Sequence, residues 1–193
     1  MSYQLKSEKD DKVRERIEEK LLRIRKILIY GEINQKLAKE VTEKLLILSS
    51  ESNQPIQLII NSQGGHVESG DTIFDMIRFC TVPVNVLGTG WVASAAALIY
   101  LATPKANRYC LPNTRFMIHQ PLGGMMGTAT DLAIEAKEIV KMKKRINETI
   151  AKQTGQSLDK VEKDTDRNYW MSADEAKKYG IVGKIITSED EIN

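Results

Sequence analysis

The chain has 193 residues, of which 41% are hydrophobic and 28% charged, a composition typical of a single globular domain with its own core. Its 28 basic and 26 acidic residues give a net charge of +2, which excludes a general electrostatic attraction to nucleic acid or to a membrane surface. The longest apolar stretch, residues 91–102, is far shorter than the roughly 20 residues that span a bilayer. The two cysteines, Cys80 and Cys110, have no metal-ligand spacing, and the first residues lack the apolar core of a signal peptide, so we expect a cytoplasmic protein without a metal.

The first hundred residues predict strands that alternate with helices. Apolar residues at near-helical spacing predict an amphipathic helix within residues 7–26. Apolar runs at 26–31, 56–61 and 82–87 predict three buried strands, with Gly88 and Gly90 ending the third. Each strand is followed by a helical pattern: Leu37 to Leu48, then residues up to about Phe79, then residues from about Val92. Repeated βαβ units of this kind predict an α/β fold with a mainly parallel sheet covered by helices.

The second half predicts one long helix and two short ones. Residues 129–153 keep an apolar stripe, and a helix of about 24 residues would be roughly 36 Å long, so we expect it to project and to pack on something else. Ser157 and the Ser172–Glu175 capping box predict the starts of two further helices. Tyr169 and Trp170 are expected to fill core, and residues 188–193 to be frayed. No linker divides the chain, so residues 1–193 are predicted to form one domain.

Ser94 and His119 are the residues most suggestive of chemistry. Ser94 lies where a helix is expected to begin, so the positive end of the helix dipole would favour an attacking alkoxide and a developing oxyanion. His119 ends a strand-like run and would serve as its base. A serine among alanines fits a tight helix contact equally well, and the Gly-x-Ser-x-Gly elbow is absent.

Residues 61–66 form a second candidate feature, because Gly64 and Gly65 follow a predicted strand. Paired glycines let backbone N–H groups face a ligand, as in an oxyanion hole, although such a pair is more often only a turn. His66 has the simpler interpretation of a loop side chain.

Taken in order, several motifs resemble one family, the ClpP proteolytic subunit of the Clp protease, from about residue 20 to residue 187. The motifs are Asn61-Ser-Gln-Gly-Gly, Gly90-Trp-Val-Ala-Ser94-Ala-Ala-Ala, Leu111-Pro-Asn, Met117-Ile-His119-Gln-Pro-Leu-Gly-Gly, Asp164-Thr-Asp-Arg-Asn168 and Ser172-Ala-Asp-Glu-Ala. The resemblance implies a crotonase-like fold, two stacked heptameric rings enclosing a chamber, an ATP-driven Clp-type unfoldase as partner, unfolded polypeptides as substrates, and no cofactor. The helix at 129–153 would be the handle through which the rings meet.

The resemblance also implies a role for individual positions. Ser94 would be the nucleophile, His119 the general base, and the N–H groups of Gly65 and Ala95 the oxyanion hole. Substrate would add as a strand beside Gly65 to Val67 and beside the glycine-rich segment, which would make recognition mostly main-chain. That segment comprises Gly123, Gly124 and Met125, and the family's apolar docking pockets for the unfoldase fall at Phe79, Leu87, Tyr109 and Leu111.

The chain departs from the family at informative positions. Asn168 stands where the family has its catalytic aspartate, so the predicted set is Ser-His-Asn and the expected activity is low, because asparagine brings no charge to stabilise an imidazolium. Asp164 and Asp166 are alternative third members. Gln57 replaces a docking aromatic and Gln63 a proline before the glycines, which would loosen the oxyanion loop. Ala95 replaces methionine, and residues 1–20 do not match the family's N-terminal stem.

We therefore expect a serine endopeptidase subunit that acts through an acyl-enzyme. One alternative is a weakly active or inactive subunit that forms mixed rings with an active paralogue. A second is an acyl-CoA enzyme of the crotonase type, against which the pairing of Ser94 with His119 argues.

Overall fold

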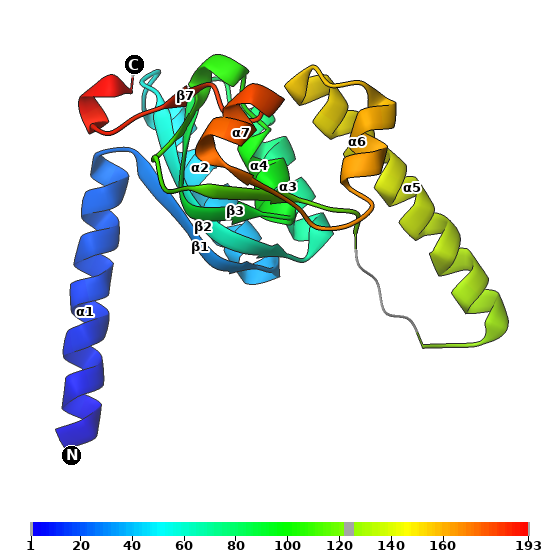
Figure 1. Cartoon of the computed structure of the whole chain (residues 1–193). Helices are drawn as coiled ribbons and strands as arrows, with labels where there is room; N and C mark the ends of the chain where they lie inside the picture. Colours follow the sequence, from blue (N-terminus) through cyan, green and yellow to red (C-terminus); the bar gives the residue numbers. More distant parts are fainter. Residues whose placement is uncertain (1, 122–125, 193) are drawn as a thin grey trace.

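The computed structural model describes residues 2–121 and 126–192, and these residues form one sheet with helices packed around it (Figure 1). The sheet has seven strands in the order β1-β2-β3-β4-β7, while β5 pairs with β3 and with β6. All pairings are parallel except that of β5 with β6, so the predicted mainly parallel α/β arrangement is confirmed. The strands are β1 (Lys26–Ile33), β2 (Ile56–Gly65), β3 (Val84–Ala93), β4 (Arg108–Cys110), β5 (Arg115–Ile118), β6 (Tyr169–Ser172) and β7 (Lys184–Ile185).

Helices connect most of the strands, and two of them extend from the body. Figure 1 shows α1 reaching away at the left, from the N-terminus, and α5 at the right. In the part of the chain described, no helix is both long and apolar enough to cross a membrane. The helices are α1 (Ser2–Arg23), α2 (Gln35–Glu51), α3 (Val67–Phe79), α4 (Ala95–Tyr100), α5 (Ala129–Thr154), α6 (Leu158–Asp164) and α7 (Ala173–Tyr179), with short 3₁₀ turns η1 (Lys105–Asn107) and η2 (Glu189–Glu191).

The core forms where the apolar periodicity of the sequence meets the sheet. In α2, the residues Val41, Leu45 and Leu48 recur at helical spacing and are all buried. The short helix α4 is buried at every position, because it packs against β2, β3 and α3. The nucleophile candidate therefore stands at the start of the most enclosed helix of the fold.

Two strands are longer than the sequence predicted. The strand β2 continues through the glycines to Gly65, and β3 continues past Gly88 and Gly90 to Ala93, so α4 begins at Ala95 rather than near Val92. Both extensions follow register shifts, after which pairing resumes at Gly64 in β2 and at Val92 in β3. Gly88 and Gly90 thus lie within β3, whereas Gly64 and Gly65 are the last two residues of β2, and residues 62–65 lie beside residues 92–94.

The helix α5 forms where the sequence predicted a long helix, and its observed bounds agree with the expected 129–153. Its first half exposes Leu132, Ile134 and Val140, whereas Ile146 and Ile150 near its end are buried. Asp71 on α3 and Arg145 on α5 form a two-pronged ion pair of 2.6 and 2.9 Å near the junction of these halves.

Two expectations about the last third of the chain are wrong. Tyr169 and Trp170 are 36% and 37% exposed, because β6 lies at an edge of the sheet, and Trp170 stacks on Trp91. The tail is held in place through residue 192: Glu191 accepts hydrogen bonds from the backbone of Thr187 and Ser188, and Glu189 pairs with Lys26 of β1.

Candidate active site

Ser94 occupies a strained turn between β3 and α4. Its φ of 56° and ψ of −123° lie in a region that residues with a side chain rarely adopt, and its N–H donates to the Met117 carbonyl at 2.9 Å. Ser94 is the N-cap residue of α4, yet its side chain makes no capping bond. The hydroxyl is instead directed toward His119, as a nucleophile requires.

His119 and Asn168 complete a continuous chain of hydrogen bonds with Ser94. The His119 Nε2 atom lies 2.7 Å from Ser94 Oγ, and His119 Nδ1 lies 3.0 Å from Asn168 Oδ1. Because an amide oxygen only accepts, Nδ1 carries the proton and Nε2 is left to accept the serine O–H. The three predicted catalytic residues therefore meet with the tautomer that a general base needs.

The alternative third members lie elsewhere. Asp164 accepts hydrogen bonds from the Lys160 ammonium at 2.6 Å and the Tyr179 hydroxyl at 2.8 Å. Asp166 pairs with Arg167 at 3.5 Å, and its backbone carbonyl accepts a bond from the side chain of Gln120. Within the described residues, Asn168 is the side chain that reaches His119 Nδ1.

The glycine loop of β2 lies directly against the Ser94 turn. A Cβ placed on Gly64 would come within 2.7 Å of Ser94 Cβ and 3.0 Å of the Ala95 nitrogen. Gly65 has a φ of +153°, and its Cβ would meet the Ile33 carbonyl oxygen at 2.3 Å. Ala95 is the first residue of α4, so its N–H has no acceptor within the helix. The two backbone amides expected to form an oxyanion hole thus belong to segments in contact at the nucleophile.

Gln63 supports this glycine loop, whereas the sequence suggested that the loss of a proline there would loosen it. With its amide turned to suit both neighbours, the side chain donates to the Gly31 carbonyl at 3.2 Å and accepts from the Glu32 N–H at 3.3 Å. Ser62 also donates to the Gly31 carbonyl and accepts from Gly64 N–H at 3.0 Å. Side-chain bonds to β1 therefore brace the loop in place of a proline ring.

A small apolar pocket opens beside Ser94 and His119. Val67, which is predicted to lie beside the substrate, is on its wall, and two wall residues come from α5. The sequence offered no signal for these α5 residues, because their only local role is to continue a helical stripe. The other lining residues are Ala95, Ala97, Leu98, Ile118, Pro121, Ile146 and Ile150. The predicted substrate-binding Gly123, Gly124 and Met125 lie outside the described residues.

His66 stands at the N-cap position of α3, makes no side-chain capping bond, and takes no part in the hydrogen-bonded chain from Ser94 to Asn168. Its Nδ1 lies 2.8 Å from Ser69 Oγ and its Nε2 lies 3.2 Å from Glu68. Ser69 is fully buried, so this second serine and histidine pair has no access to a substrate. The interpretation of His66 as a loop side chain agrees with these contacts.

The four predicted docking residues differ in exposure. Phe79 is 72% exposed at the end of α3, Leu87 and Leu111 are half-buried, and Tyr109 is buried. Their role remains a prediction.

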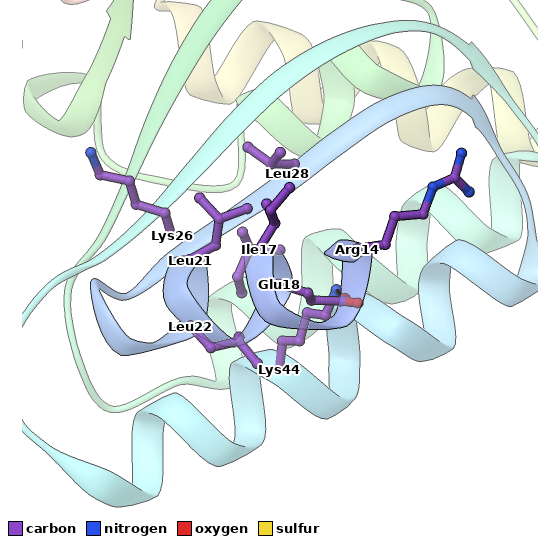
Figure 2. Close-up of a pocket in the computed structure, with 9 residues that line it drawn as sticks. Arg14, Ile17, Glu18, Leu21, Leu22, Lys26, Leu28 and Lys44 are labelled. Carbon is purple, nitrogen blue, oxygen red and sulfur yellow. Dashed lines mark hydrogen bonds and ion pairs between the residues drawn. The ribbon is translucent and has the colours of Figure 1, made fainter. Parts of the chain in front are cut away.

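A separate groove lies between α1 and β1 (Figure 2). Figure 2 shows Ile17, Leu21 and Leu28 along it, and an ion pair between Glu18 of α1 and Lys44 of α2 beside them. The sequence predicted the amphipathic helix but not the surface that its apolar side covers.

Comparison with known proteins now decides the family. The family model "Clp protease" matches residues 8–189. This chain belongs to the Clp protease family. It is a serine-type endopeptidase of this family, as the resemblance implied, and not an acyl-CoA enzyme.

Curated relatives and solved structures agree with this assignment. ATP-dependent Clp protease proteolytic subunit 3 of Rhizobium johnstonii is 54% identical over 190 residues, covering 96% of this chain and 98% of that protein. Subunit 2 of Gluconobacter oxydans is 58% identical over 178 residues, covering 91% and 80%. ClpP1 of Listeria monocytogenes has a TM-score of 0.83 at 56% identity, and an asparagine-to-aspartate mutant of it has 0.86, each covering 92% of this chain and 99% of that one. The predicted crotonase-like ClpP fold is confirmed.

Proposed function

We propose that this subunit cleaves polypeptides through an acyl-enzyme formed on Ser94. The hydrogen-bonded chain from Ser94 through His119 to Asn168, with distances of 2.7 and 3.0 Å, carries the proposal. Ser94 Oγ attacks the scissile carbonyl while His119 Nε2 takes its proton, and the amides of Gly65 and Ala95 receive the oxyanion. His119 then protonates the leaving amine, and water releases the acyl group by the same route in reverse.

The pocket beside Ser94 supports a preference for an apolar side chain next to the cleaved bond. Most of its lining is aliphatic, including Leu98, Ile118 and Ile146. Substrate would lie as an extended strand along Gly65 to Val67, so the remaining recognition would come from main-chain bonds that tolerate many sequences. Unfolded polypeptides fit this arrangement, because their backbone N–H and C=O groups are not already paired within a fold.

Asn168 supports a low intrinsic rate. Its amide accepts the His119 N–H but adds no negative charge, so the imidazolium that forms during attack is less stabilised than it would be beside a carboxylate.

Assembly and partners follow from the family. We infer stacked heptameric rings that meet through α5, whose first half exposes Leu132, Ile134 and Val140. A Clp-type ATP-dependent unfoldase would dock at the apolar surface that includes Phe79, with Leu87, Tyr109 and Leu111 contributing where neighbouring subunits meet. Cys80 and Cys110 are both unpaired, which agrees with a reducing cytoplasm.

Labelling of the purified chain by a serine-reactive fluorophosphonate tests this function. We expect labelling of the assembled protein that is lost in Ser94→Ala, together with loss of peptide hydrolysis. Ser69→Ala is the matched control, because Ser69 also contacts a histidine but is buried, and it should leave labelling intact. Labelling that persists in Ser94→Ala, or is absent from intact double rings, would overturn the assignment of the nucleophile.

Asn168 also favours a second candidate, in which this chain joins rings with a more active paralogue. Mixing the two purified proteins tests it: co-assembly should change the rate or the partner choice of the active subunit. Failure to co-assemble, with no change in the paralogue's rate, would remove this candidate.

A further inference from the structure

Little in the structure fixes which way the side-chain amide of Asn168 is turned. Its side chain is exposed, and within the described part of the chain its one hydrogen bond is that between Oδ1 and His119 Nδ1. A bond between two neutral groups is about half as strong as one to a carboxylate, and an amide turned by half a rotation would present a donor to His119. The His119–Asn168 contact therefore depends on where the backbone holds Asn168.

Gln120, which is the residue after His119, binds the backbone just before Asn168. Its backbone N–H donates to the Thr165 carbonyl at 2.6 Å. Its side-chain Nε2 donates to the Asp166 carbonyl at 2.7 Å. Both bonds end on residues two or three positions before Asn168, so the segments that carry the base and its orienting residue are joined twice.

The other side of the same contact is fixed by the sheet. The antiparallel pairing of β5 with β6 sets Ile118 opposite Tyr169, and one further step in this register sets His119 opposite Asn168. The pairing of the two strands stops at Ile118, so Gln120 supplies the bonds that close the far side of the pair. His119 and Asn168 thus lie between the paired strands on one side and the two hydrogen bonds of Gln120, to Thr165 and Asp166, on the other. We call these two bonds the Gln120 clasp.

One of the two acceptors, the Thr165 carbonyl, belongs to a buried residue, whereas Asp166 is exposed. Thr165 is fully buried, and its hydroxyl lies 2.9 Å from the side-chain oxygen of Asn147 on α5 and 2.9 Å from the Val161 carbonyl. Asn147 is itself 1% exposed. The backbone bond of Gln120 therefore ends on a residue packed in the core against α5, and its side-chain bond ends on the next residue along the chain.

We propose that Gln120 is a positioning residue that holds Asn168 in line with His119, and that the neutral Asn168 makes the catalytic site depend on it. This inference rests on the proposed function. A carboxylate at position 168 offers two equivalent oxygens and a charge, so it would find the His119 N–H without the clasp. The side-chain bond of Gln120 should consequently matter much more beside asparagine than beside aspartate.

A double-mutant cycle tests this dependence in the assembled protein. Gln120→Met keeps the shape of the side chain and removes its donor, and it is made in the native chain and in Asn168→Asp. We expect kcat for a peptide substrate to fall about 10- to 100-fold in the native background and less than about 3-fold in Asn168→Asp, with KM little changed. Gln35→Met, at an exposed glutamine that starts α2, is the matched control. Equal losses in both backgrounds, or no loss in the native one, would overturn the proposal.

A second readout keeps this result separate from the proposed function. The chain has two histidines, so nitrogen NMR of the imidazole rings can follow the Nδ1–H of His119 without any turnover. Gln120→Met should replace the single Nδ1–H form of His119 by a mixture of tautomers, while the His66 signals stay unchanged. An unaltered His119 signal would refute the role of Gln120. If the native protein shows the Nδ1–H form but no Ser94-dependent turnover, the proposed function fails and the positioning role stands.

Discussion

Replacing Asn168 by aspartate should raise the peptidase activity of this protein. Asn168 Oδ1 already accepts the His119 Nδ1–H at 3.0 Å, so the substitution adds a charge without changing the pairing. The gain should appear in kcat/KM, because the imidazolium and the carboxylate attract each other only once Ser94 has given up its proton.

The size of this gain can be estimated from Coulomb's law. Unit charges about 4 Å apart attract by about 1 kcal/mol in water and about 4 kcal/mol at an effective dielectric constant of 20. Asn168 is exposed, which places the pair in the lower part of this range, at about 1–2.5 kcal/mol. At about 1.36 kcal/mol for each factor of ten, kcat/KM should rise about 5- to 70-fold.

The assay compares the initial rates of peptide hydrolysis by the native chain and Asn168→Asp, with the assembly state measured on the same samples. Asn53→Asp adds the same charge to an exposed loop and should leave the rate unchanged. An unchanged or lower rate in intact rings would refute the reasoning and would mean that asparagine is adapted to this site. In another serine protease, exchanging aspartate for asparagine lowers kcat about 10⁴-fold. A rise of that size in Asn168→Asp would mean that the Asn168 amide mostly presents its NH₂ group, and not its oxygen, to His119.

Three further changes test other parts of the structure. Gly64→Ala should slow labelling of Ser94 more than about 100-fold, because the new methyl would meet the Ser94 turn at 2.7 Å. The control is Gly155→Ala, where φ is also positive but the methyl would meet open space. It should cost only about 1 kcal/mol of stability and keep the labelling rate. Arg108→Met should lower the free energy of unfolding, measured in urea, by about 3–5 kcal/mol, because the buried guanidinium donates to several backbone carbonyls that would lose their donor. Lys105→Met, at an exposed position, is the control, and an equally small effect of both substitutions would contradict this. Bonds from Ser172 lower the pKa of Glu175 from its usual 4.5. The stability gained from that carboxylate is therefore present above pH 4.5 and is lost as the pH falls through the lowered pKa. The difference in unfolding free energy between the native chain and Glu175→Gln should shrink in acid, and a constant difference would argue against this.

Periodicity predicted most of the helices and strands, because each depends on neighbours in the sequence. The stripe of Val41, Leu45 and Leu48 predicted α2, and the residues of the Ser172–Glu175 capping box predicted the start of α7. The ends of β2 and β3 were missed, since glycine breaks a pattern whether it marks a turn or a bulge, and only the pairing with a neighbouring strand distinguishes these. The exposure of Trp170 was missed for a related reason: the sequence does not show which strand forms the edge of the sheet.

For the catalytic residues, the amino-acid order alone establishes which chemistry is available: one serine at a helix start, one histidine at a strand end, and asparagine where the family has aspartate. These can be recognised without a structure because residue identity and order are local properties. That Ser94, His119 and Asn168 form one hydrogen-bonded chain, that Gln63 braces the glycine loop, and that Gln120 joins the segments of His119 and Asn168 became visible only in the folded chain. The bonds of His119 join residues 25 and 49 positions apart, and their distances are set by the packing of the sheet against α4 and α5, which no local pattern encodes.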